Sequence, residues 1–320
     1  MRVFHSASEM PPDFGPSVVT IGNFDGVHLG HREIMRRVAA LARERGLTPT
    51  VLTFDPHPAR VLAPERAPKL INTIPQRLRR LEREGIEAAL LLPFSLEFAK
   101  LSPERFAREI LAQALKARVV LVGEDFRFGF RQSGSIDTLR ELGGPLGFEL
   151  QPVAAVSSVV AGKQDRISST RIRELVAAGR VSRACRIMGE PFALEGAVVP
   201  GQGIGSKKTV PTLNLAAENE LLPKTGVYVT RTRDEASGRE WSSITNVGYR
   251  PTFNGQSPTV ETFLLDGRPA ETPVRIEVAF LTFMRDEMRF ETPESLKSRI
   301  LRDAAAAKRF HTRFSRLRMG

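Results

Sequence analysis

The sequence is poor in cysteine, in long apolar runs and in low-complexity segments, and each absence narrows the kind of protein that it encodes. Its one cysteine, Cys185, cannot form an internal disulfide, which favours a reducing compartment. No apolar run approaches the about 18 residues of a membrane-spanning helix, and residues 1–16 hold no apolar core of signal-peptide length. The sequence therefore predicts a cytoplasmic protein that is neither secreted nor membrane-spanning.

The sequence also lacks a concentrated block of charge, although its overall balance is basic. Lys and Arg number 47 against 36 Asp and Glu, a formal net charge of +11 at pH 7. Such a balance suits a nucleic-acid-binding protein or an enzyme that acts on polyphosphates. The basic residues are spread over several predicted helices without the interleaved aromatics of RNA-binding modules, so most are expected to be solvated. Charge alone does not decide between the two classes.

The first half of the chain alternates predicted strands with predicted helices. The strand-like runs are continuous and apolar, as expected for a parallel sheet that is covered on both faces. Ser102 and Pro103 form a predicted helix start, and Gly46, Gly85 and Gly143 are predicted helix ends. The expected fold class is a doubly wound, Rossmann-like α/β sheet. Its strands are expected at residues 17–22, 48–54, 88–93, 118–123 and 148–153, and its helices at 31–45, 75–84, 103–114 and 135–142.

The second half changes to short β-rich runs separated by turns, a pattern that predicts an antiparallel barrel or sandwich. A closing helix is expected after Thr292 as N-cap and Pro293. We place the boundary between residues 188 and 192, giving domains 1–188 and 189–320, and expect Cys185 to be a small buried residue just before it. Strands are expected at residues 192–199, 226–232, 242–247, 259–265 and 274–281.

A histidine pair follows the first predicted strand. His28 and His31 flank Gly30 at the mouth of the first helix, where backbone N–H groups and the helix dipole favour anions. The glycine lets a phosphate approach closely, and two imidazoles add donors that can become cationic as charge builds on a transferring phosphoryl group. The alternative is a surface or metal-binding pair, which the few nearby carboxylates disfavour.

A second candidate anion site lies at residues 167–173. Ser168, Ser169 and Thr170 open a predicted helix together with Arg171 and Arg173; taken alone, they could equally be an ordinary N-cap with solvated arginines. An HxGH after the first strand and an SSTxxR after the last together resemble the signature of the nucleotidylyltransferase superfamily. Those enzymes attack the α-phosphate of a nucleoside triphosphate and release pyrophosphate.

Two further segments narrow this resemblance. With the run around His28, residues 53–58 and 123–129 resemble the FMN adenylyltransferase module of bacterial bifunctional riboflavin kinase/FAD synthetases. Both segments follow strands, so they are expected to face the same crevice as the histidines. Aromatic and proline side chains are expected to wall the flavin ring, although one of Phe126 and Phe128 is expected in the core. The flavin-binding residues expected here are Phe54, Pro56, His57, Pro58, Asp125, Phe126 and Phe128. ATP is expected to contact Gly22, Asn23, Phe24, Gly30, Ser168, Ser169 and Thr170, with His28, His31 and Arg173 as catalytic residues.

The second half resembles the riboflavin kinase module of the same family. A glycine-rich segment at 196–205 leads to Pro211-Thr-Leu-Asn214, followed by motifs at 226–228, 246–253, 260–262 and 283–287. Because no helix follows Gly201, Gly203 and Gly205, a phosphate flap is more plausible than a dinucleotide-binding fingerprint, with an ordinary loop as the alternative. The resemblance implies that Thr212 and Asn214 bind Mg²⁺, that Glu261 is the general base, and that Asn246 and Arg250 contact the flavin. ATP is expected to contact Gly203, Gly205, Lys207 and Lys208.

The kinase half departs from its family at one place. Before Pro-Thr-x-Asn the family usually shows Gly-Arg-x-Leu-Gly-Phe, whereas this chain has Gly205-Ser-Lys-Lys-Thr-Val210. Thr209 cannot cheaply replace a glycine that adopts positive φ. Since Thr212, Asn214 and Glu261 remain, we expect an active kinase that grips ATP partly through Lys207 or Lys208.

The resulting hypothesis is a two-module enzyme that phosphorylates riboflavin to FMN and adenylylates FMN to FAD, using ATP and Mg²⁺. Its expected partners are therefore riboflavin, FMN, FAD and ATP, with neither nucleic acid nor membrane among them. Two alternatives stay open: an FMN adenylyltransferase whose barrel has lost kinase activity and only binds flavin, and a nucleic-acid-binding protein. The sequence gives no oligomeric state.

Overall fold

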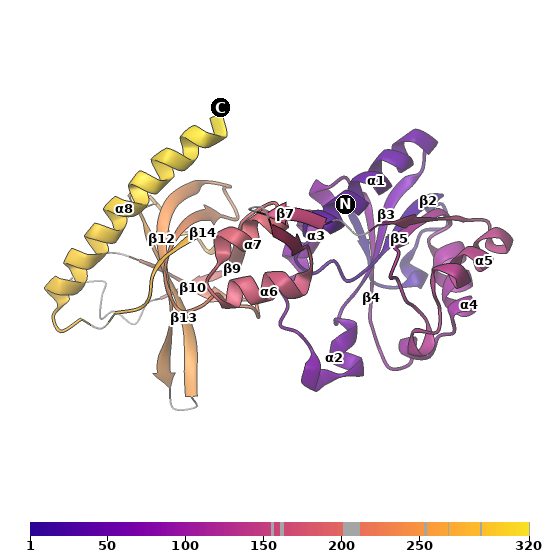
Figure 1. The fold of residues 1–320 in the computed structure, drawn as a ribbon, viewed down its shortest axis with the longest axis horizontal. Coiled ribbons are helices and arrows are strands. Elements are labelled where there is room, and N and C mark those ends of the chain that lie inside the picture. The colour runs from indigo at the N-terminus through magenta and orange to yellow at the C-terminus, as the bar shows by residue number, and fades with distance from the viewer. Residues whose placement is uncertain are drawn as a thin grey trace. The chain divides into compact units, whose positions relative to one another are not determined.

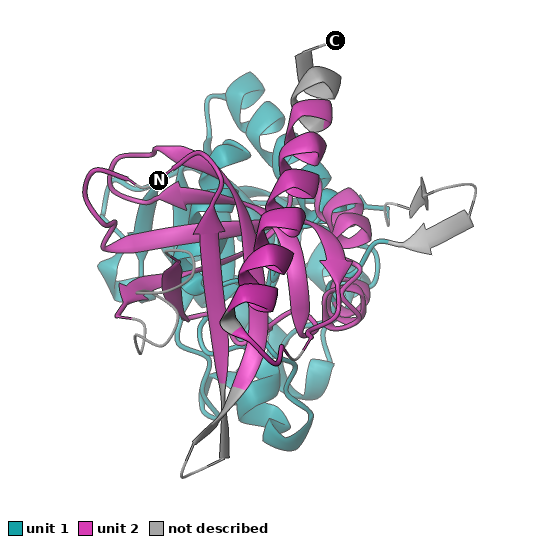
Figure 2. Cartoon of the chain, turned by 90° about the vertical axis from the view of Figure 1, so that its left-hand side faces the viewer, with its two compact units in different colours: residues 1–169 teal, residues 170–320 magenta. Residues whose placement is uncertain are grey.

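The chain divides into two compact units, Met1–Ser169 and Thr170–Gly320 (Figure 1, Figure 2). The computed structural model describes residues 1–154, 157–160, 163–200, 212–252, 255–267, 269–288 and 290–319. Each unit has its own apolar core. Among the helices in these residues, none has both the length and the apolar character needed to cross a membrane.

The first unit is built on a six-stranded sheet of order β1-β4-β3-β2-β5-β6, in which every neighbouring pair is parallel. The expected doubly wound sheet is therefore confirmed. The strand bounds are β1 Arg2–Phe4, β2 Ser17–Ile21, β3 Thr48–Phe54, β4 Ala88–Leu92, β5 Ala117–Gly123 and β6 Glu149–Val153. Within this sheet only β1 was not expected, because three residues are too few to show a periodic pattern.

Helices cover both faces of this sheet, as neighbouring residues of β2 show. Val18 belongs to one apolar cluster, with Met35 and Val38 of α1, whereas Val19 belongs to another, with Leu111 and Leu139. Successive side chains of a strand point to opposite faces, so each face has its own core. The helices are α1 Leu29–Arg45, α2 Pro58–Leu62, α3 Ile74–Arg83, α4 Pro103–Arg105 and α5 Ile136–Leu146, with a π-helical segment Phe106–Ala114 after α4. Short 3-10 turns span Ala7–Glu9, Pro64–Arg66, Phe98–Lys100 and Phe130–Gln132, and β7 Ser157–Val160 pairs with β8 Lys163–Arg166 as a hairpin.

Most of the predicted helix ends are confirmed, with one exception. The Ser102 hydroxyl accepts the Arg105 N–H at 3.3 Å, and Gly46 ends α1 in the left-handed conformation. Gly143 does not end α5, which continues to Leu146 and stops at Gly147. A Cβ on Gly143 would lie 2.6 Å from the Phe148 carbonyl oxygen. The glycine therefore permits close packing of the helix on the following strand rather than ending the helix.

The second unit is a closed antiparallel barrel of order β10-β13-β12-β11-β14-β9, as expected, with helices packed against it. Strand β10 was not expected, because its sequence was considered only as a motif. The bounds are β9 Phe192–Val199, β10 Leu213–Ala217, β11 Gly226–Asp234, β12 Glu240–Thr252, β13 Gly255–Leu264 and β14 Arg275–Arg285, with α6 Ser169–Ala177, α7 Val181–Met188 and α8 Pro293–Met319.

The barrel strands have an outer face under α8 and an opposite face on which several buried hydroxyl groups lie. Val229 and Ile244 form one apolar cluster with Ala304 and Ala307 of α8. The adjacent Thr230 points to the opposite face, where its buried hydroxyl joins a chain of hydroxyl groups. This chain also includes Thr232, Ser243, Thr245 and Thr262. The N-terminus of α8 is capped by Thr292 as expected, since its hydroxyl accepts the Ser295 N–H at 3.2 Å.

Helices α6 and α7 belong to the second compact unit, although the sequence boundary at residues 188–192 assigned them to the first domain. The fully buried residues Val181, Ile187 and Met188 lie on α7, which packs against β9 and β14 of the barrel. The Lys224 N–H also donates to the Val176 carbonyl at 3.3 Å, which joins α6 to the chain before β11. Cys185 is half-buried on α7 rather than buried.

Candidate active sites

The loop after β2 holds the first candidate site in a strained backbone. Phe24 and Val27 have positive φ angles of 48° and 37°, which is uncommon for any side chain and costly for a β-branched one. A Cβ on Gly22 would lie 2.9 Å from the Phe24 ring, so a glycine is needed there. The buried Phe24 ring in turn meets the His31 ring edge-on at 5.2 Å. Such local strain is typical of functional sites.

His28 and His31 lie together at the mouth of α1. Their rings stack with centroids 3.6 Å apart and an interplanar angle of 15°. His28 caps the helix, because its Nδ1 accepts the His31 backbone N–H at 3.3 Å. This bond leaves the ring proton of neutral His28 on Nε2, so that atom can donate to a ligand. A Cβ on Gly30 would lie 3.2 Å from the His28 Nδ1, so the glycine also gives this ring room.

Burial lowers the pKa of both imidazoles. Burial lowers the pKa of His28 to about 4. Burial, followed by the neighbouring His28, lowers the pKa of His31 well below its usual value. Since removal from water disfavours the charged form, both rings are neutral at pH 7 in this state and act as neutral hydrogen-bond donors.

A buried polar network, which the sequence analysis did not predict, holds the loop after β2 in place. The Asp25 carboxylate accepts the backbone N–H groups of Ile71 and Asn72, at 3.1 Å each. The Asn72 side-chain oxygen accepts the Gly26 N–H at 2.9 Å and an Arg80 N–H at 3.2 Å. These contacts fix the loop to the start of α3. Residues 69–73 follow no strand or motif, so nothing in the sequence pointed to them.

Arg77 of α3 is the second feature that sequence reasoning missed. It is 1% exposed, and its Nη1 donates to the Asn23 carbonyl at 3.0 Å, the Phe54 carbonyl at 3.2 Å and the Thr53 hydroxyl at 3.3 Å. Burial lowers its pKa, while the nearby carboxylates of Asp25 and Asp55 raise it. Arg77 is four residues before the apolar Leu81, so both lie on the same face of the helix. This spacing was the indication in the sequence that Arg77 is buried.

The structure brings the second predicted anion motif to the same loop through one residue. The Ser169 hydroxyl donates to the Asp25 carbonyl at 2.7 Å, within the first compact unit. Ser168 precedes it, and Thr170 and Arg173 lie further along α6, in the second unit. The expected contacts of these residues with ATP stay predictions.

The predicted flavin residues of the first unit belong to a cluster of phenylalanine rings. Phe54 packs against Phe94 and Phe98, with ring centroids 5.5 and 5.8 Å apart. The cluster continues through Phe106 to Phe128, which is buried and stacks on the partly exposed Phe126 at 5.6 Å. Phe94 and Phe98 were not predicted, because the segment after β4 resembled no motif.

The other predicted flavin residues in this unit occupy local caps and loops. The Asp55–Pro56 peptide is cis, His57 accepts the Ala59 N–H at 3.2 Å, and Pro58 begins α2. Asp125 is exposed in the loop after β5. The chain thus turns into a short helix directly after β3, beside the phenylalanine cluster.

In the barrel, three predicted residues lie in one row across neighbouring strands. Asn214 of β10 pairs in register with Glu261 of β13, which pairs with Asn246 of β12. Residues directly opposite each other on antiparallel strands have adjacent side chains. The Asn246 amide also donates to the Glu287 carboxylate at 3.3 Å, which adds a carboxylate from the chain after β14. The row combines carboxylate and amide groups that suit hydroxyl and metal ligands.

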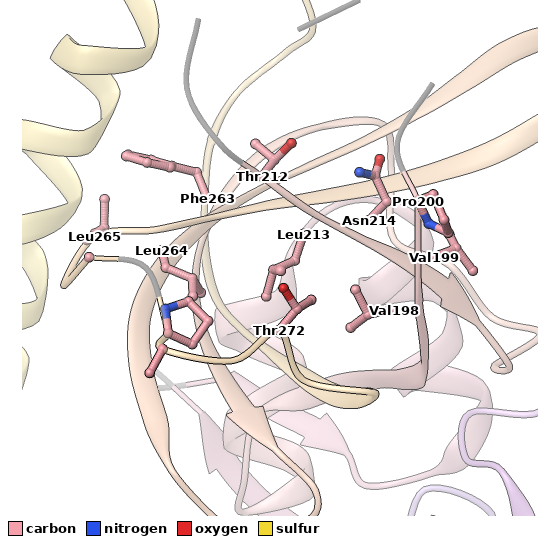
Figure 3. Close-up of a pocket in the computed structure, with 13 residues that line it drawn as sticks. Val198, Val199, Pro200, Thr212, Leu213, Asn214, Phe263, Leu264, Leu265 and Thr272 are labelled. Carbon is pink, nitrogen blue, oxygen red and sulfur yellow. The ribbon is translucent and has the colours of Figure 1, made fainter. Parts of the chain in front are cut away.

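A cavity of about 550 Å³ adjoins one end of this row. Thr212 and Asn214 line it together with apolar residues that include Val198 and Phe263 (Figure 3). Thr212 lies directly before β10 and Asn214 lies within it, so the start of this strand brings both polar side chains to the cavity. Gly203, Gly205, Lys207 and Lys208 lie outside the described residues, as does the side chain of Arg250.

Known protein families and relatives match nearly the whole chain. The family model of FAD synthetase matches residues 11–171, and that of riboflavin kinase matches residues 188–311. The chain is 32% identical to a bifunctional riboflavin kinase/FMN adenylyltransferase of Escherichia coli strain K12, over 97% of each chain. It is 34% identical to that of Pseudomonas fluorescens, over 96% of this chain and 97% of the relative. A Streptococcus pneumoniae crystal structure titled as a macrolide-efflux protein is similar with a TM-score of 0.83 and 28% identity, over 96% and 98% of the two chains.

Proposed function

The chain belongs to the family of bifunctional riboflavin kinase/FMN adenylyltransferases, and we propose how its two units divide the two reactions. It phosphorylates riboflavin to FMN with ATP, and it then adenylylates FMN to FAD with release of pyrophosphate. The α/β unit performs the adenylylation and the barrel performs the phosphorylation. One observation carries this division: the His28–His31 pair lies inside one compact unit, and the Asn214–Glu261 row lies inside the other.

Adenylylation joins the FMN phosphate to the α-phosphorus of ATP and breaks the bond to the pyrophosphate oxygen. The FMN phosphate is already ionised near pH 7, so the reaction needs no strong base. His28, through Nε2–H, and His31 donate hydrogen bonds to the phosphate oxygens as charge develops there. Ser169, Thr170 and Arg173 hold the leaving phosphates, while Gly22, Asn23, Phe24, Gly30 and Ser168 form the remaining ATP contacts.

The flavin ring of FMN binds against the phenylalanine cluster after β3, β4 and β5. Phe54 and Phe126 are partly exposed and present their rings to the ligand together with Pro56, His57 and Pro58. Phe128 is 7% exposed, so it supports Phe126 from below. Aromatic walls with a few polar groups, here Asp125, are typical of ligand pockets.

In the barrel, Glu261 accepts the proton of the terminal ribityl hydroxyl of riboflavin while that oxygen attacks the γ-phosphorus of ATP, and the bond from this phosphorus to the bridging oxygen breaks to release ADP. The Thr212 hydroxyl and the Asn214 side-chain carbonyl are neutral oxygen donors that line the same cavity, so they would fit Mg²⁺ bound together with ATP phosphates. The metal supplies charge neutralisation on those phosphates. Asn246 and Arg250 orient the flavin, and Gly203, Gly205, Lys207 and Lys208 hold ATP.

We place the boundary of the two functional modules at residues 188–192, which is supported by the start of the riboflavin kinase family model at residue 188, whereas the FAD synthetase model ends earlier, at residue 171. Helices α6 and α7 carry part of the first module's motif but pack with the barrel. We also propose a cytoplasmic location, since a single cysteine and the use of ATP suit a reducing compartment.

The test incubates the purified chain with riboflavin, ATP and Mg²⁺ and separates FMN and FAD by chromatography. The proposal expects FMN to appear first and FAD to follow. A parallel reaction starts from FMN in place of riboflavin. If FAD forms from FMN but riboflavin is never phosphorylated, the barrel only binds flavin and the chain is an adenylyltransferase alone.

A further inference from the structure

One arginine in the α/β unit contacts both loops that the proposed adenylylation site uses. The Nη1 atom of Arg77 donates to the carbonyl of Asn23, in the loop after β2, and to the carbonyl of Phe54, at the end of β3. Asn23 lies on the proposed ATP side and Phe54 on the proposed FMN side. The third acceptor, the Thr53 hydroxyl, itself donates to the Asn23 carbonyl at 3.4 Å, so the two loops are joined twice.

The hydrogen bonds of Arg77 are distributed unevenly over its three nitrogen atoms. A guanidinium Nη1 carries two hydrogens, yet three acceptors lie within 3.3 Å of it, so they share these hydrogens. Meanwhile the Nε and Nη2 atoms are buried, and neither has a hydrogen-bond partner among the described residues. Buried unpaired donors are rare and cost free energy, so packing alone does not explain why an arginine stands here.

The helix that carries Arg77 is fixed to the same loop at its start. The Asp25 carboxylate holds the Ile71 and Asn72 N–H groups, and Thr73 and Gln76 form a capping box that begins α3. Because its helix is anchored to the same loop, the Arg77 guanidinium holds the Asn23 and Phe54 carbonyls at fixed positions relative to α3. A shift of the Asn23 carbonyl toward or away from Nη1 changes the hydrogens available to Phe54.

We propose that Arg77 is a positioning residue that couples ATP binding to FMN binding in the α/β unit. This inference rests on the proposed function of that unit. A shift of the Asn23 carbonyl on ATP binding frees an Nη1 hydrogen for the Phe54 carbonyl, and the end of β3 is then held in the position that FMN requires. The coupling is positive, and thermodynamic reciprocity requires the same factor in both directions.

The test measures initial rates of FAD formation from FMN and ATP by the full-length chain, over a matrix of both concentrations. Starting from FMN leaves the kinase reaction out of the measurement. The KM for FMN is expected to fall about 5-fold or more between low and saturating ATP, the lower end of ordinary allosteric coupling. In Arg77→Met, the ratio of the KM for FMN at low ATP to the KM for FMN at saturating ATP is expected to approach 1. Arg83→Met, which removes an exposed arginine of the same helix, is the control and keeps the wild-type ratio.

The remaining outcomes also test the proposal. If Arg77→Met is only less stable, with a lower rate but the wild-type KM ratio, Arg77 is structural and the proposal is wrong. A wild-type ratio of 1 overturns it as well. If Arg77→Met does not fold, Thr53→Val removes one acceptor and Arg77→Lys keeps the charge without the fork, and both must lower the ratio. Absence of FAD from the wild-type chain instead rejects the proposed function itself.

Discussion

The His28 and His31 rings stack 3.6 Å apart, and the backbone N–H of His31 donates to the Nδ1 of His28. One histidine thus caps the helix that carries the other. This arrangement fixes the position and the tautomer of the His28 ring before any ligand binds, which is the preorganisation that stabilisation of a developing negative charge requires.

Removal of either imidazole is expected to slow FAD formation while FMN formation stays near wild type. His28→Asn keeps an N-cap acceptor but loses the ring donor, and His31→Ala loses the second ring. Loss of one preorganised donor costs on the order of 10²–10³ in rate. Chromatographic assays with FMN and with riboflavin as separate substrates measure the two activities. His5→Ala, an exposed histidine, serves as the control. Equal loss of both activities in a folded variant contradicts the assignment of two sites.

The histidine pair is also expected to make the α/β unit less stable in mild acid. The folded pKa of His28, about 4, lies below its unfolded value of 6.5, so the unfolded chain binds more protons between these values. The stabilising contribution is therefore complete above pH 6.5 and is lost as the pH falls toward 4. The loss is at most about 1.4 kcal/mol per pH unit for each histidine.

Calorimetry of the full-length chain between pH 7.5 and 5 measures this effect, and a His28→Asn/His31→Leu double variant should show a smaller decrease in melting temperature. Trp241, the single tryptophan, is buried in the barrel and reports that unit separately by fluorescence. Its transition should respond to pH equally in both proteins. An unchanged pH dependence of the α/β unit in the double variant would mean that the imidazoles remain protonated in the folded state.

In the barrel, Glu261→Gln is expected to lower riboflavin phosphorylation by about 10²-fold or more, because a general base typically contributes 10²–10⁴. FAD formation from supplied FMN should not change. Glu271→Gln, at an exposed carboxylate outside the strands, is the matched control. If Glu261→Gln retains the wild-type rate of FMN formation, another group takes the proton, and the candidate is Glu287, whose carboxylate accepts a hydrogen bond from Asn246.

Separate pieces of the chain are expected to keep one activity each. The stability of the barrel piece is expected to depend on its first residue. A piece of residues 170–320 retains α7, whose buried Val181, Ile187 and Met188 cover β9 and β14. A piece of residues 189–320 lacks this cover, and each fully buried apolar side chain of this size contributes about 1.5–3 kcal/mol. Thermal unfolding followed by Trp241 fluorescence should give the longer piece the higher midpoint. Equal midpoints would show that α7 adds nothing to the barrel.

The sequence predicted the fold class, both cores and most strands, because these depend on periodic patterns that each segment carries by itself. Continuous apolar runs such as 119–122 indicated a covered parallel sheet, and Thr292 and Ser102 indicated helix starts. One failure occurred where a contact with a later residue outweighed the local pattern: Gly143 was interpreted as a helix end, but it lies against Phe148. The packing of α7 against β9 and β14 was not predicted either, because it depends on strands that lie further along the chain.

The sequence alone identified His28, His31, Thr212, Asn214 and Glu261 as candidate residues, since the type and spacing of such side chains reflect the chemistry that they perform. Only the tertiary structure decided which of them meet and in what state. Burial makes the two imidazoles neutral, strand register puts Asn214 beside Glu261, and the fold buries Arg77 beneath the loops at Asn23 and Phe54. Desolvation and register arise from residues far apart in the chain, so no local pattern records them.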